Sequence, residues 1–469
     1  MSKLLKNTIL YSVGEIVPRI LSFILLPVYT RYLSPKDYGI LSYTNSFVMF
    51  LFVVCCLSLN SYLLRHYFDL DKETERKKLI GNVFLFITTI NVGILLLSFL
   101  IFPPVLSYYN IQVSWKPYFM LAIINNFLEV FTVIPMAVFR IKQQAKNFIT
   151  LSLSRVLLQA ALICYFVVVQ RTGVAGYYYG QLIIAGIFLP VYCFIILKNG
   201  TINWNFRQIK DGLAFSLPLL PATLSYLIMT LSDRILLERN ISLSRIGIYN
   251  VAVTLSYALN IIIQSGYKAI EPEIFRQYKT PFFPKFINHT KSIYFAAIYI
   301  CAMGLSLFSK DFFYYFTSPP FHEGYKLVPY ILCGVIMSGE NVIYSGILSA
   351  EKNTKAIGWA TACGGFLSIV LNIIFIPKIG VWSAAFAHAF AFFLMNGMLY
   401  LKAAYNGKSM KKELLCLAAF VLFNIINQNM QLIADGIWAF CITTGILFVF
   451  IVFILIVYKI NVLKLLSPK

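Results

Sequence analysis

Long apolar runs follow one another along almost the whole chain, separated by short polar segments. The hydrocarbon core of a bilayer requires about 20 mostly apolar residues in one helix. None of the polar segments is long enough to form a soluble domain. The pattern predicts an all-α integral membrane protein with 14 transmembrane helices, at residues 8–29, 39–62, 80–102, 118–139, 148–169, 176–197, 212–236, 246–270, 291–308, 327–349, 356–376, 382–402, 413–429 and 437–458.

The composition also indicates a chain that lies in lipid. Apolar residues make up 59% of the 469 residues, charged residues make up 12%, and the mean hydropathy is +0.77. A soluble fold of this size cannot bury so much apolar surface, which excludes a soluble enzyme, a disordered chain and a secreted disulfide scaffold. The nine cysteines lie in apolar runs without CxxC spacing, so we predict no zinc site and no disulfide framework.

Lys and Arg are unequally shared between alternate loops. Of the 39 Lys and Arg residues, 27 lie in segments on the predicted side of the N-terminus and 9 on the opposite side. Cytoplasmic loops carry the excess of positive charge, so this predicts that both termini are cytoplasmic. The net charge of +21 is then explained by membrane orientation and does not indicate a nucleic-acid partner.

The two halves of the chain resemble each other. Arg31, Ser34, Gly39 and Ile40 recur some 208 residues later as Arg239, Ser242, Gly247 and Ile248. Further along, the segment 142–146 pairs with 351–355, and 173–176 pairs with 380–383. These matches predict that helices 1–6 repeat as helices 7–12 in parallel orientation, with helices 13 and 14 as an addition. The predicted domains are residues 1–205, 206–405 and 406–469. Such a repeat is typical of alternating-access transporters, with the substrate site between the halves near mid-membrane. A channel or a scaffold with duplicated helices is the alternative.

Several of these segments resemble a known family. Asn7-Thr8, Pro27 and the segment Thr30-Arg31-Tyr32-Leu33-Ser34-Pro35-Lys36-Asp37-Tyr38-Gly39-Ile40 are similar to the start of Wzx-type polysaccharide flippases. Leu217-Pro218-Leu219-Leu220-Pro221, Ser232-Asp233-Arg234 and Ile246-Gly247-Ile248-Tyr249 are similar to the start of their second half, and Asn372 with Ile376-Pro377-Lys378-Ile379-Gly380 to a later segment. These proteins belong to the multidrug/oligosaccharidyl-lipid/polysaccharide exporter superfamily.

The resemblance implies two six-helix bundles arranged in a V that open alternately to each side of a bacterial inner membrane. It implies a substrate as well, an oligosaccharide repeat unit on undecaprenyl pyrophosphate, such as an O-antigen unit, which is turned from the inner to the outer leaflet. Helices 13 and 14 are usual in this branch, whereas the small-drug exporters of the superfamily typically stop at twelve helices.

Basic side chains inside predicted spans are candidates for binding the pyrophosphate, because ionisable groups in the membrane are costly and Arg binds phosphate in bidentate fashion. These are Arg19, Arg155, Arg234 and Lys268. Related lipid II flippases carry an Arg at the position of Arg19, in a similar Arg-x-Leu-x-Phe setting. As alternatives, Arg19 forms a structural ion pair with Glu15, Arg155 serves helix packing, and Arg234 and Lys268 reach the interface from helix ends.

Three acidic residues, Glu15, Glu129 and Glu340, are candidates for coupling to H⁺ or Na⁺. The alternative is that each neutralises a neighbouring basic residue or bonds to the backbone. Pro218 and Pro221 together predict a bend in helix 7, since Pro removes a helical hydrogen bond.

Motifs for other chemistry are missing from the sequence. It contains no Walker A motif, no HExxH and no GxSxG at a strand–helix turn, so we predict no enzyme, no cofactor and no metal site. The alternatives to a flippase are a drug/cation antiporter of the same superfamily, which would need an acidic cavity, and a membrane polysaccharide polymerase or ligase, which usually has a sizeable outer loop.

Overall fold

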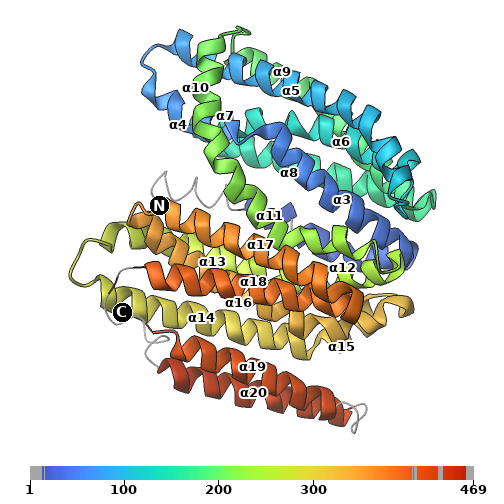
Figure 1. The fold of residues 1–469 in the computed structure, drawn as a ribbon, viewed down its shortest axis with the longest axis vertical. Coiled ribbons are helices and arrows are strands. Elements are labelled where there is room, and N and C mark those ends of the chain that lie inside the picture. The colour runs from blue at the N-terminus through green and yellow to red at the C-terminus, as the bar shows by residue number, and fades with distance from the viewer. Residues whose placement is uncertain are drawn as a thin grey trace. The chain divides into compact units, whose positions relative to one another are not determined.

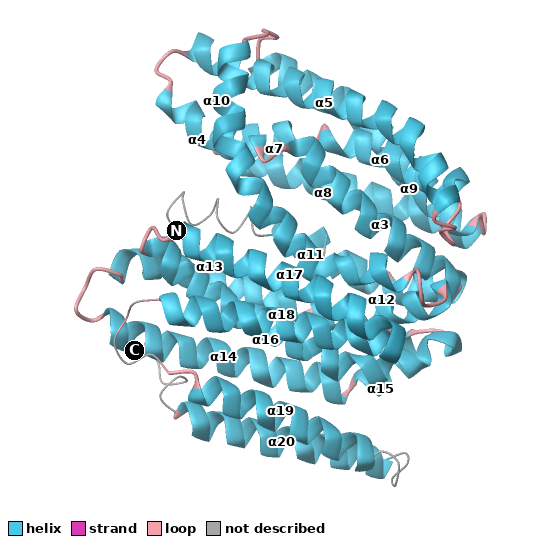
Figure 2. Cartoon of the chain, viewed as in Figure 1, coloured by secondary structure: helices cyan, strands magenta, loops and turns pink. Residues whose placement is uncertain are grey.

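The computed structural model describes residues 13–14, 16–18, 20–403, 405, 409–430 and 437–460 (Figure 1). Every regular element in these ranges is a helix, and they contain no strand (Figure 2). Thirteen helical segments among them are long and apolar enough to span a membrane. They match the second to fourteenth predicted spans one by one, which confirms the all-α membrane fold. The first predicted span, 8–29, lies only partly within the described residues, so the total of fourteen stays a prediction.

The chain divides into two compact units, Met1–Gly247 and Ile248–Lys469. Packing places the seventh span in the first unit, whereas the sequence repeat assigns it to the second half. The division into residues 1–205, 206–405 and 406–469 therefore stays a prediction.

The first unit consists of long helices joined by short turns. Within it, α8 packs against α9, α6 against α9, and α11 against α3. Its elements are α2 (Leu26–Tyr32), α3 (Pro35–Cys56), α4 (Leu59–His66), η1 (Tyr67–Asp69), α5 (Glu73–Tyr108), η2 (Trp115–Phe119), α6 (Met120–Val130), α7 (Val133–Ile141), α8 (Ala145–Cys164), η3 (Tyr165–Val169), α9 (Gly173–Asn199), α10 (Phe206–Ser216), η4 (Leu217–Leu219) and α11 (Leu220–Leu237), followed by the start of α12 (Leu243–Tyr257).

The second unit is centred on α16, which packs against α13, α14 and α18. Helices α19 and α20 pair with each other, and both lie against α14 (Figure 1). After the end of α12, its elements are α13 (Leu259–Gln277), α14 (Phe283–Leu307), α15 (Ser309–Phe316), η5 (Pro319–Leu327), α16 (Val328–Ala350), α17 (Thr354–Ile379), α18 (Val381–Lys402), α19 (Lys411–Met430) and α20 (Ile437–Tyr458).

Local sequence signals explain where several helices begin and break. Helix α3 starts with a capping box, in which the Ser34 hydroxyl accepts from the Asp37 backbone N–H and the Asp37 carboxylate accepts from the Ser34 N–H. In the seventh span, a 3₁₀ turn over Leu217–Leu219 separates α10 from α11 beside Pro218 and Pro221. This interruption agrees with the predicted effect of the proline pair.

A close crossing of α3 and α12 joins two glycines that are equivalent in the sequence repeat. A Cβ atom on Gly39 would lie 1.9 Å from the carbonyl oxygen of Leu243. A Cβ atom on Gly247 would lie 1.9 Å from the carbonyl oxygen of Pro35, the residue that the repeat matches to Leu243. Each half thus contributes the same glycine and the same carbonyl, and the crossing is pseudo-symmetric.

Two further pairs of repeat-matched positions share an unusual backbone conformation. Gln143 and Lys352, between successive helices in either half, have positive φ angles of 54° and 59°. Gly173 and Gly380, each at the start of the next helix, both have φ of 61°. Positive φ is rare for residues other than glycine, so its recurrence at matched positions supports the predicted duplication.

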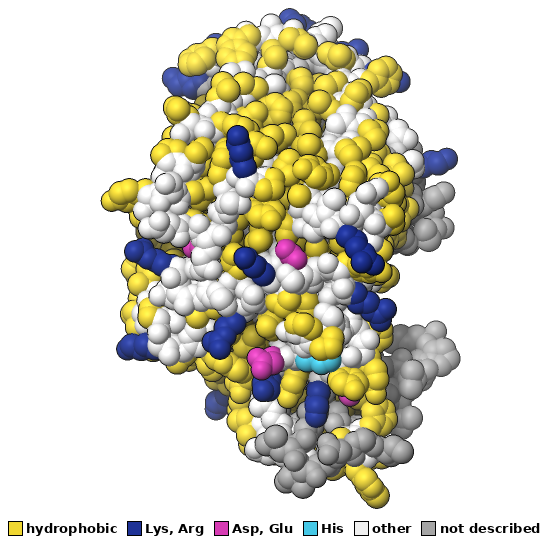
Figure 3. All heavy atoms as spheres, turned by 90° about the vertical axis from the view of Figure 1, so that its right-hand side faces the viewer, with side chains coloured by type: hydrophobic (Ala, Val, Ile, Leu, Met, Phe, Trp, Pro, Cys, Tyr) yellow, Lys and Arg dark blue, Asp and Glu magenta, His cyan; other side chains and the backbone are white. Residues whose placement is uncertain are grey.

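Large apolar side chains cover much of the outside of the molecule, and Figure 3 shows one such face with basic side chains scattered over it. Helix α5 is the longest element, with 36 residues. Its C-terminal half exposes Leu96, Leu97, Leu100 and Ile101. Exposed apolar surface of this extent fits contact with lipid chains.

Candidate functional site

Two of the predicted site residues meet in the first unit. Arg155 on α8 forms an ion pair with Glu129 on α6, through one terminal guanidinium nitrogen and Oε1. Both side chains are largely buried, with 15% and 22% exposed. The Nε atom of Arg155 is buried and has no hydrogen-bond partner. The pair therefore neutralises one charge of each kind and leaves the buried Nε–H of Arg155 without an acceptor.

Polar side chains from neighbouring helices surround this ion pair. Asn125, one turn before Glu129 on α6, donates to Oε1 of Gln181 on α9 at 2.7 Å. Tyr177 on α9 interacts with Gln181 and lies within the electrostatic reach of Glu129. These groups form a polar cluster between helices that otherwise bury apolar residues. Burying polar and charged groups inside a membrane costs free energy, so this cluster marks the contact of α6, α8 and α9 as a candidate site.

Arg234 is also buried, near the end of α11, with 4% exposed. Its Nη1 donates to Oδ1 of Asp233 at 3.0 Å and to the carbonyl oxygen of Thr230 at 2.6 Å. Because the residue adjacent in sequence supplies the counter-charge, this Arg–Asp unit is close to neutral.

The remaining basic and acidic candidates are distributed differently. Lys268 is exposed on α13. Arg19 and Glu15 lie outside the described residues, so their pairing and their role stay predictions. Glu340, the third acidic candidate, lies in the second unit at a distinct polar cluster.

Glu340 on α16 is fully enclosed, with 1% exposed. Its Oε1 is 3.0 Å from the hydroxyl of Tyr299 on α14, and its Oε2 accepts from Nδ2 of Asn396 on α18 at 2.6 Å. The same Tyr299 hydroxyl lies 2.9 Å from the backbone carbonyl oxygen of Glu413 on α19. Three helices thus meet at one carboxyl group, and a fourth is reached through Tyr299.

An ion pair that sequence reasoning missed completes this cluster. Lys291 on α14 places Nζ 2.8 Å from Oε1 of Glu413, and the two side chains are 6% and 2% exposed. Lys291 also donates to the Tyr344 hydroxyl and to the Ser409 carbonyl oxygen, both at 3.2 Å. The predicted span 291–308 put Lys291 at a helix end, but α14 begins at Phe283. Pro284, in the first turn, was the signal that could have located this earlier start.

Outside the membrane-spanning segments, Glu238 joins two loops of the first unit. It follows α11 and is 3% exposed. Its Oε1 accepts from the backbone N–H of Gln112, and the Gln112 side chain donates to the carbonyl oxygen of Glu238 at 2.6 Å. Burial raises the pKa of Glu238, although the Gln112 N–H opposes the shift.

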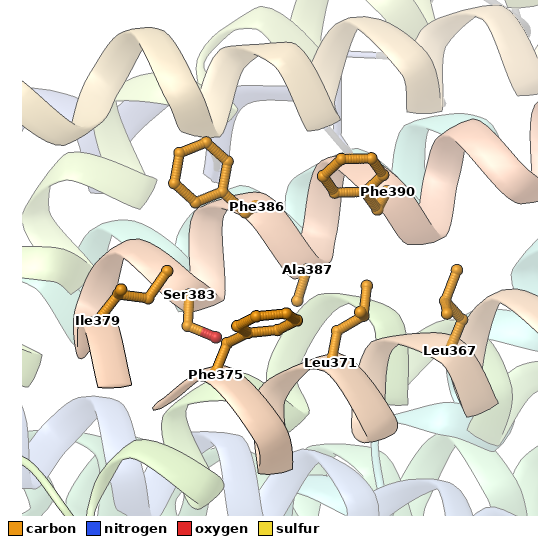
Figure 4. A pocket seen from close by; sticks show the side chains of 8 residues that line it. All are labelled: Leu367, Leu371, Phe375, Ile379, Ser383, Phe386, Ala387 and Phe390. Carbon is orange, nitrogen blue, oxygen red and sulfur yellow. The ribbon is translucent and has the colours of Figure 1, made fainter. Parts of the chain in front are cut away.

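An apolar pocket of about 450 Å³ lies between α17 and α18. Figure 4 shows Leu371 and Phe375 on one helix opposite Phe386 and Phe390 on the other. Its lining includes one hydroxyl, that of Ser383, and no charged group. This pocket offers no counter-charge to a pyrophosphate and suits a hydrocarbon chain.

The described part of the chain contains no disulfide bond and no cluster of metal-ligating side chains. All nine cysteines are free there. Within the same residues, no group of three or more His, Cys, Asp or Glu side chains could hold a metal ion.

Three comparisons place this fold among known proteins. The family model described as "Polysaccharide biosynthesis protein" matches residues 4–276. The Lsg locus putative protein 1 of Haemophilus influenzae is 22% identical over 289 residues, which cover 59% of this chain and 67% of that protein.

Two solved structures share the architecture. The lipid II flippase MurJ in an inward closed conformation is similar with a TM-score of 0.78 and 17% identity, over 96% of this chain and 99% of that chain. An inward-facing MATE multidrug transporter of the MOP superfamily is similar with a TM-score of 0.64 and 12% identity, over 83% of this chain and 96% of that one. The family match covers more than half of the sequence and confirms the resemblance noted above, so this chain belongs to the polysaccharide biosynthesis protein family and has the fold shared by MurJ and the MATE transporters.

Proposed function

We propose that this protein is a flippase, and not an enzyme, which moves undecaprenyl-pyrophosphate-linked oligosaccharide repeat units from the inner to the outer leaflet of a bacterial inner membrane. The observation that carries the proposal is the family match together with a MurJ-like fold over almost the whole chain. Alternating access of the two halves, with both termini cytoplasmic, would expose the head-group site to each side in turn.

The basic candidates are assigned to the pyrophosphate. Arg155 has a guanidinium donor without a partner in addition to its bond with Glu129. Substrate oxygens would use this donor. Arg19 and Lys268 would add positive charge along the path, and the guanidinium of Arg234, whose charge Asp233 balances, would add N–H donors. Glu15, Glu129 and Glu340 are the candidates for coupling the cycle to H⁺ or Na⁺.

Export from cells tests this proposal. In a strain that depends on this chain for surface polysaccharide, Arg19→Ala and Arg155→Ala should each make lipid-linked repeat units accumulate on the inner leaflet. Leaflet location is measured by access of an impermeant glycosidase or lectin to the sugars of spheroplasts and inverted vesicles. Lys310→Ala, at a half-exposed position on α15, is the matched control and should export normally. Normal export by both arginine variants would refute the cationic path.

The MATE likeness keeps a drug/cation antiporter as a second candidate. Coverage favours the flippase, since the MurJ likeness extends over 96% of this chain and the MATE likeness over 83%. Helices α19 and α20 correspond to the predicted helices 13 and 14, whereas drug exporters typically stop at twelve helices. Deletion that abolishes drug resistance and leaves surface polysaccharide intact would support the antiporter instead.

A further inference from the structure

The hydroxyl of Tyr299 has more acceptors around it than it can serve. It lies 3.0 Å from Oε1 of Glu340 and 2.9 Å from the carbonyl oxygen of Glu413. A tyrosine hydroxyl carries one hydrogen and can accept through its own lone pairs. A carbonyl oxygen can only accept, so both contacts are hydrogen bonds at once only when Tyr299 donates to Glu413. The remaining contact is a hydrogen bond only when Glu340 itself carries a hydrogen on Oε1.

The balance of charges in the cluster also indicates a proton on Glu340. Glu340, Glu413 and Lys291 are each at most 6% exposed, and the Lys291 ammonium already pairs with Glu413 at 2.8 Å. With both carboxyl groups ionised, the buried cluster would hold one unmatched negative charge. An unpaired buried charge is strongly unfavourable, and a bound proton removes it. Oε2 of Glu413 is buried without a hydrogen-bond partner, so no further donor stabilises this carboxylate against a second negative charge on Glu340.

The groups that face Glu340 come from every side of the cluster. Described charged or titratable side chains within its electrostatic reach are Lys291 and Tyr299 on α14, Tyr344 on α16 itself, Glu413 and Cys416 on α19, and Tyr458 on α20. Helix α18 contributes the neutral Asn396, and α13 contributes Ile263 beside Gly339. Lys291 is the one cation among these side chains, and Glu413 neutralises it.

We propose that Glu340 is a proton-binding site whose occupancy is relayed through Tyr299 to the start of α19. In the loaded state, the Glu340 carboxyl O–H donates to Tyr299, and Tyr299 donates to the Glu413 carbonyl. When Glu340 releases its proton to water, the carboxylate becomes the better acceptor, and the Tyr299 hydrogen turns toward it. The contact between α14 and the Glu413 carbonyl is then lost, so proton release loosens the first turn of α19. Only the link between this site and transport rests on the proposed function.

Infrared spectroscopy of the full chain in liposomes detects the proton directly. The wild type should show the C=O stretch of a protonated carboxyl group, shifted by D₂O and lost reversibly as the buffer is changed from acidic to alkaline. Glu340→Gln, which keeps an N–H donor toward Tyr299 and an oxygen acceptor toward Asn396, should lack this band. Exposed Glu323→Gln should keep it. An identical carboxyl band in the wild type and in Glu340→Gln would overturn the proposal.

Hydrogen exchange of the peptide at 411–416 reports the relay. At alkaline pH, its amides in the wild type should exchange about two- to tenfold faster than in Glu340→Gln at the same pH, the effect of one hydrogen bond. At acidic pH the two should agree, and Tyr299→Phe should exchange faster at both. Equal rates in all three proteins would refute the relay, and a Tyr299→Phe variant that melts like the wild type shows that a loss of folding does not explain its faster exchange.

A sodium ion is the competing occupant. Replacing sodium with choline at constant pH should change neither readout. Sodium-dependent slowing of exchange without a protonated carboxyl band would assign the site to Na⁺ and overturn the proton. Neither the infrared nor the exchange measurement needs a substrate. If both fail, the proton site is refuted even when polysaccharide export is intact. If both succeed and export fails, only the proposed function is refuted.

Discussion

Arg155 and Glu129 show how a buried residue can serve stability and function at once. Removing the guanidinium leaves the Glu129 carboxylate in the helix contact without its partner. We expect Arg155→Ala to destabilise the protein by roughly 1–3 kcal/mol, the usual penalty for an unsatisfied buried polar group. The measurement is the thermal unfolding midpoint of the purified protein in detergent.

A double variant separates the two roles of Arg155. Arg155→Ala combined with Glu129→Ala removes both charges, so stability should recover most of the loss. If Arg155 contacts the pyrophosphate, export should stay impaired in the double variant. If export recovers together with stability, Arg155 serves only to neutralise Glu129 and does not bind the pyrophosphate.

Glu238 predicts a local pH dependence of stability. Burial raises its pKa above the ordinary value of 4.5, so the folded chain holds this proton more tightly than the unfolded chain. The stabilising contribution is complete below that ordinary value and is lost as pH rises through the folded-state pKa. Glu238→Gln keeps an acceptor for Gln112, and its unfolding midpoint should decline less with rising pH than that of the wild type. Parallel declines would contradict the assignment.

The sequence predicted single charged residues well and their partners poorly. Intramembrane Glu129, Arg155 and Glu340 stand out because they interrupt apolar runs, and the structure describes all three inside helices. Their pairing depends on which helix faces align, and this is set by packing between segments that are distant in sequence. Lys291 and Glu413 escaped notice because a hydropathy pattern locates helix ends only to within a few residues.

Among the elements, the α3–α12 crossing is a tightly constrained contact of the first unit. A methyl group on Gly39 or on Gly247 would overlap a backbone carbonyl, which cannot move aside as a side chain does. Gly39→Ala and Gly247→Ala should therefore push the helices apart and each cost about 1–3 kcal/mol, as measured by thermal unfolding. Gly93→Ala on α5 is the matched control, because nothing lies within 4 Å of its Cβ position and Ala favours a helix. Equal stability of all three variants would show that the helices do not meet this closely.

The membrane spans could be predicted from the sequence for a physical reason. In lipid the backbone must satisfy its own hydrogen bonds, and a continuous apolar run of about 20 residues does so as a helix, so apolar length identifies a span. All thirteen described spans had been predicted. The predicted repeat includes turn positions where a positive φ favours glycine, as at Gly173 and Gly380. Apolar positions between these turns tolerate exchange among apolar residues of similar size, so the sequence shows no such match there.

On the scale of the whole molecule, the charge asymmetry predicts a membrane orientation. Single cysteines placed at Gln144 and at Gln170 in a cysteine-free chain lie in successive loops, after α7 and after η3. A membrane-impermeant maleimide should label the Gln170→Cys protein in intact cells and the Gln144→Cys protein only after permeabilisation. The opposite labelling pattern would invert the predicted topology. Labelling of denatured protein controls for the reactivity of each cysteine.

Helix α5 has a consequence for the choice of host membrane. From Leu79 to Tyr108 it runs about 45 Å at 1.5 Å per residue, whereas a bilayer core is about 30 Å thick. A helix that exceeds the hydrocarbon by half must tilt, or it must thicken the lipid around it. The length of the lipid acyl chains would thus change the tilt of α5. In short-chain lipids we expect α5 to tilt further from the membrane normal, or its end to extend into the headgroup region.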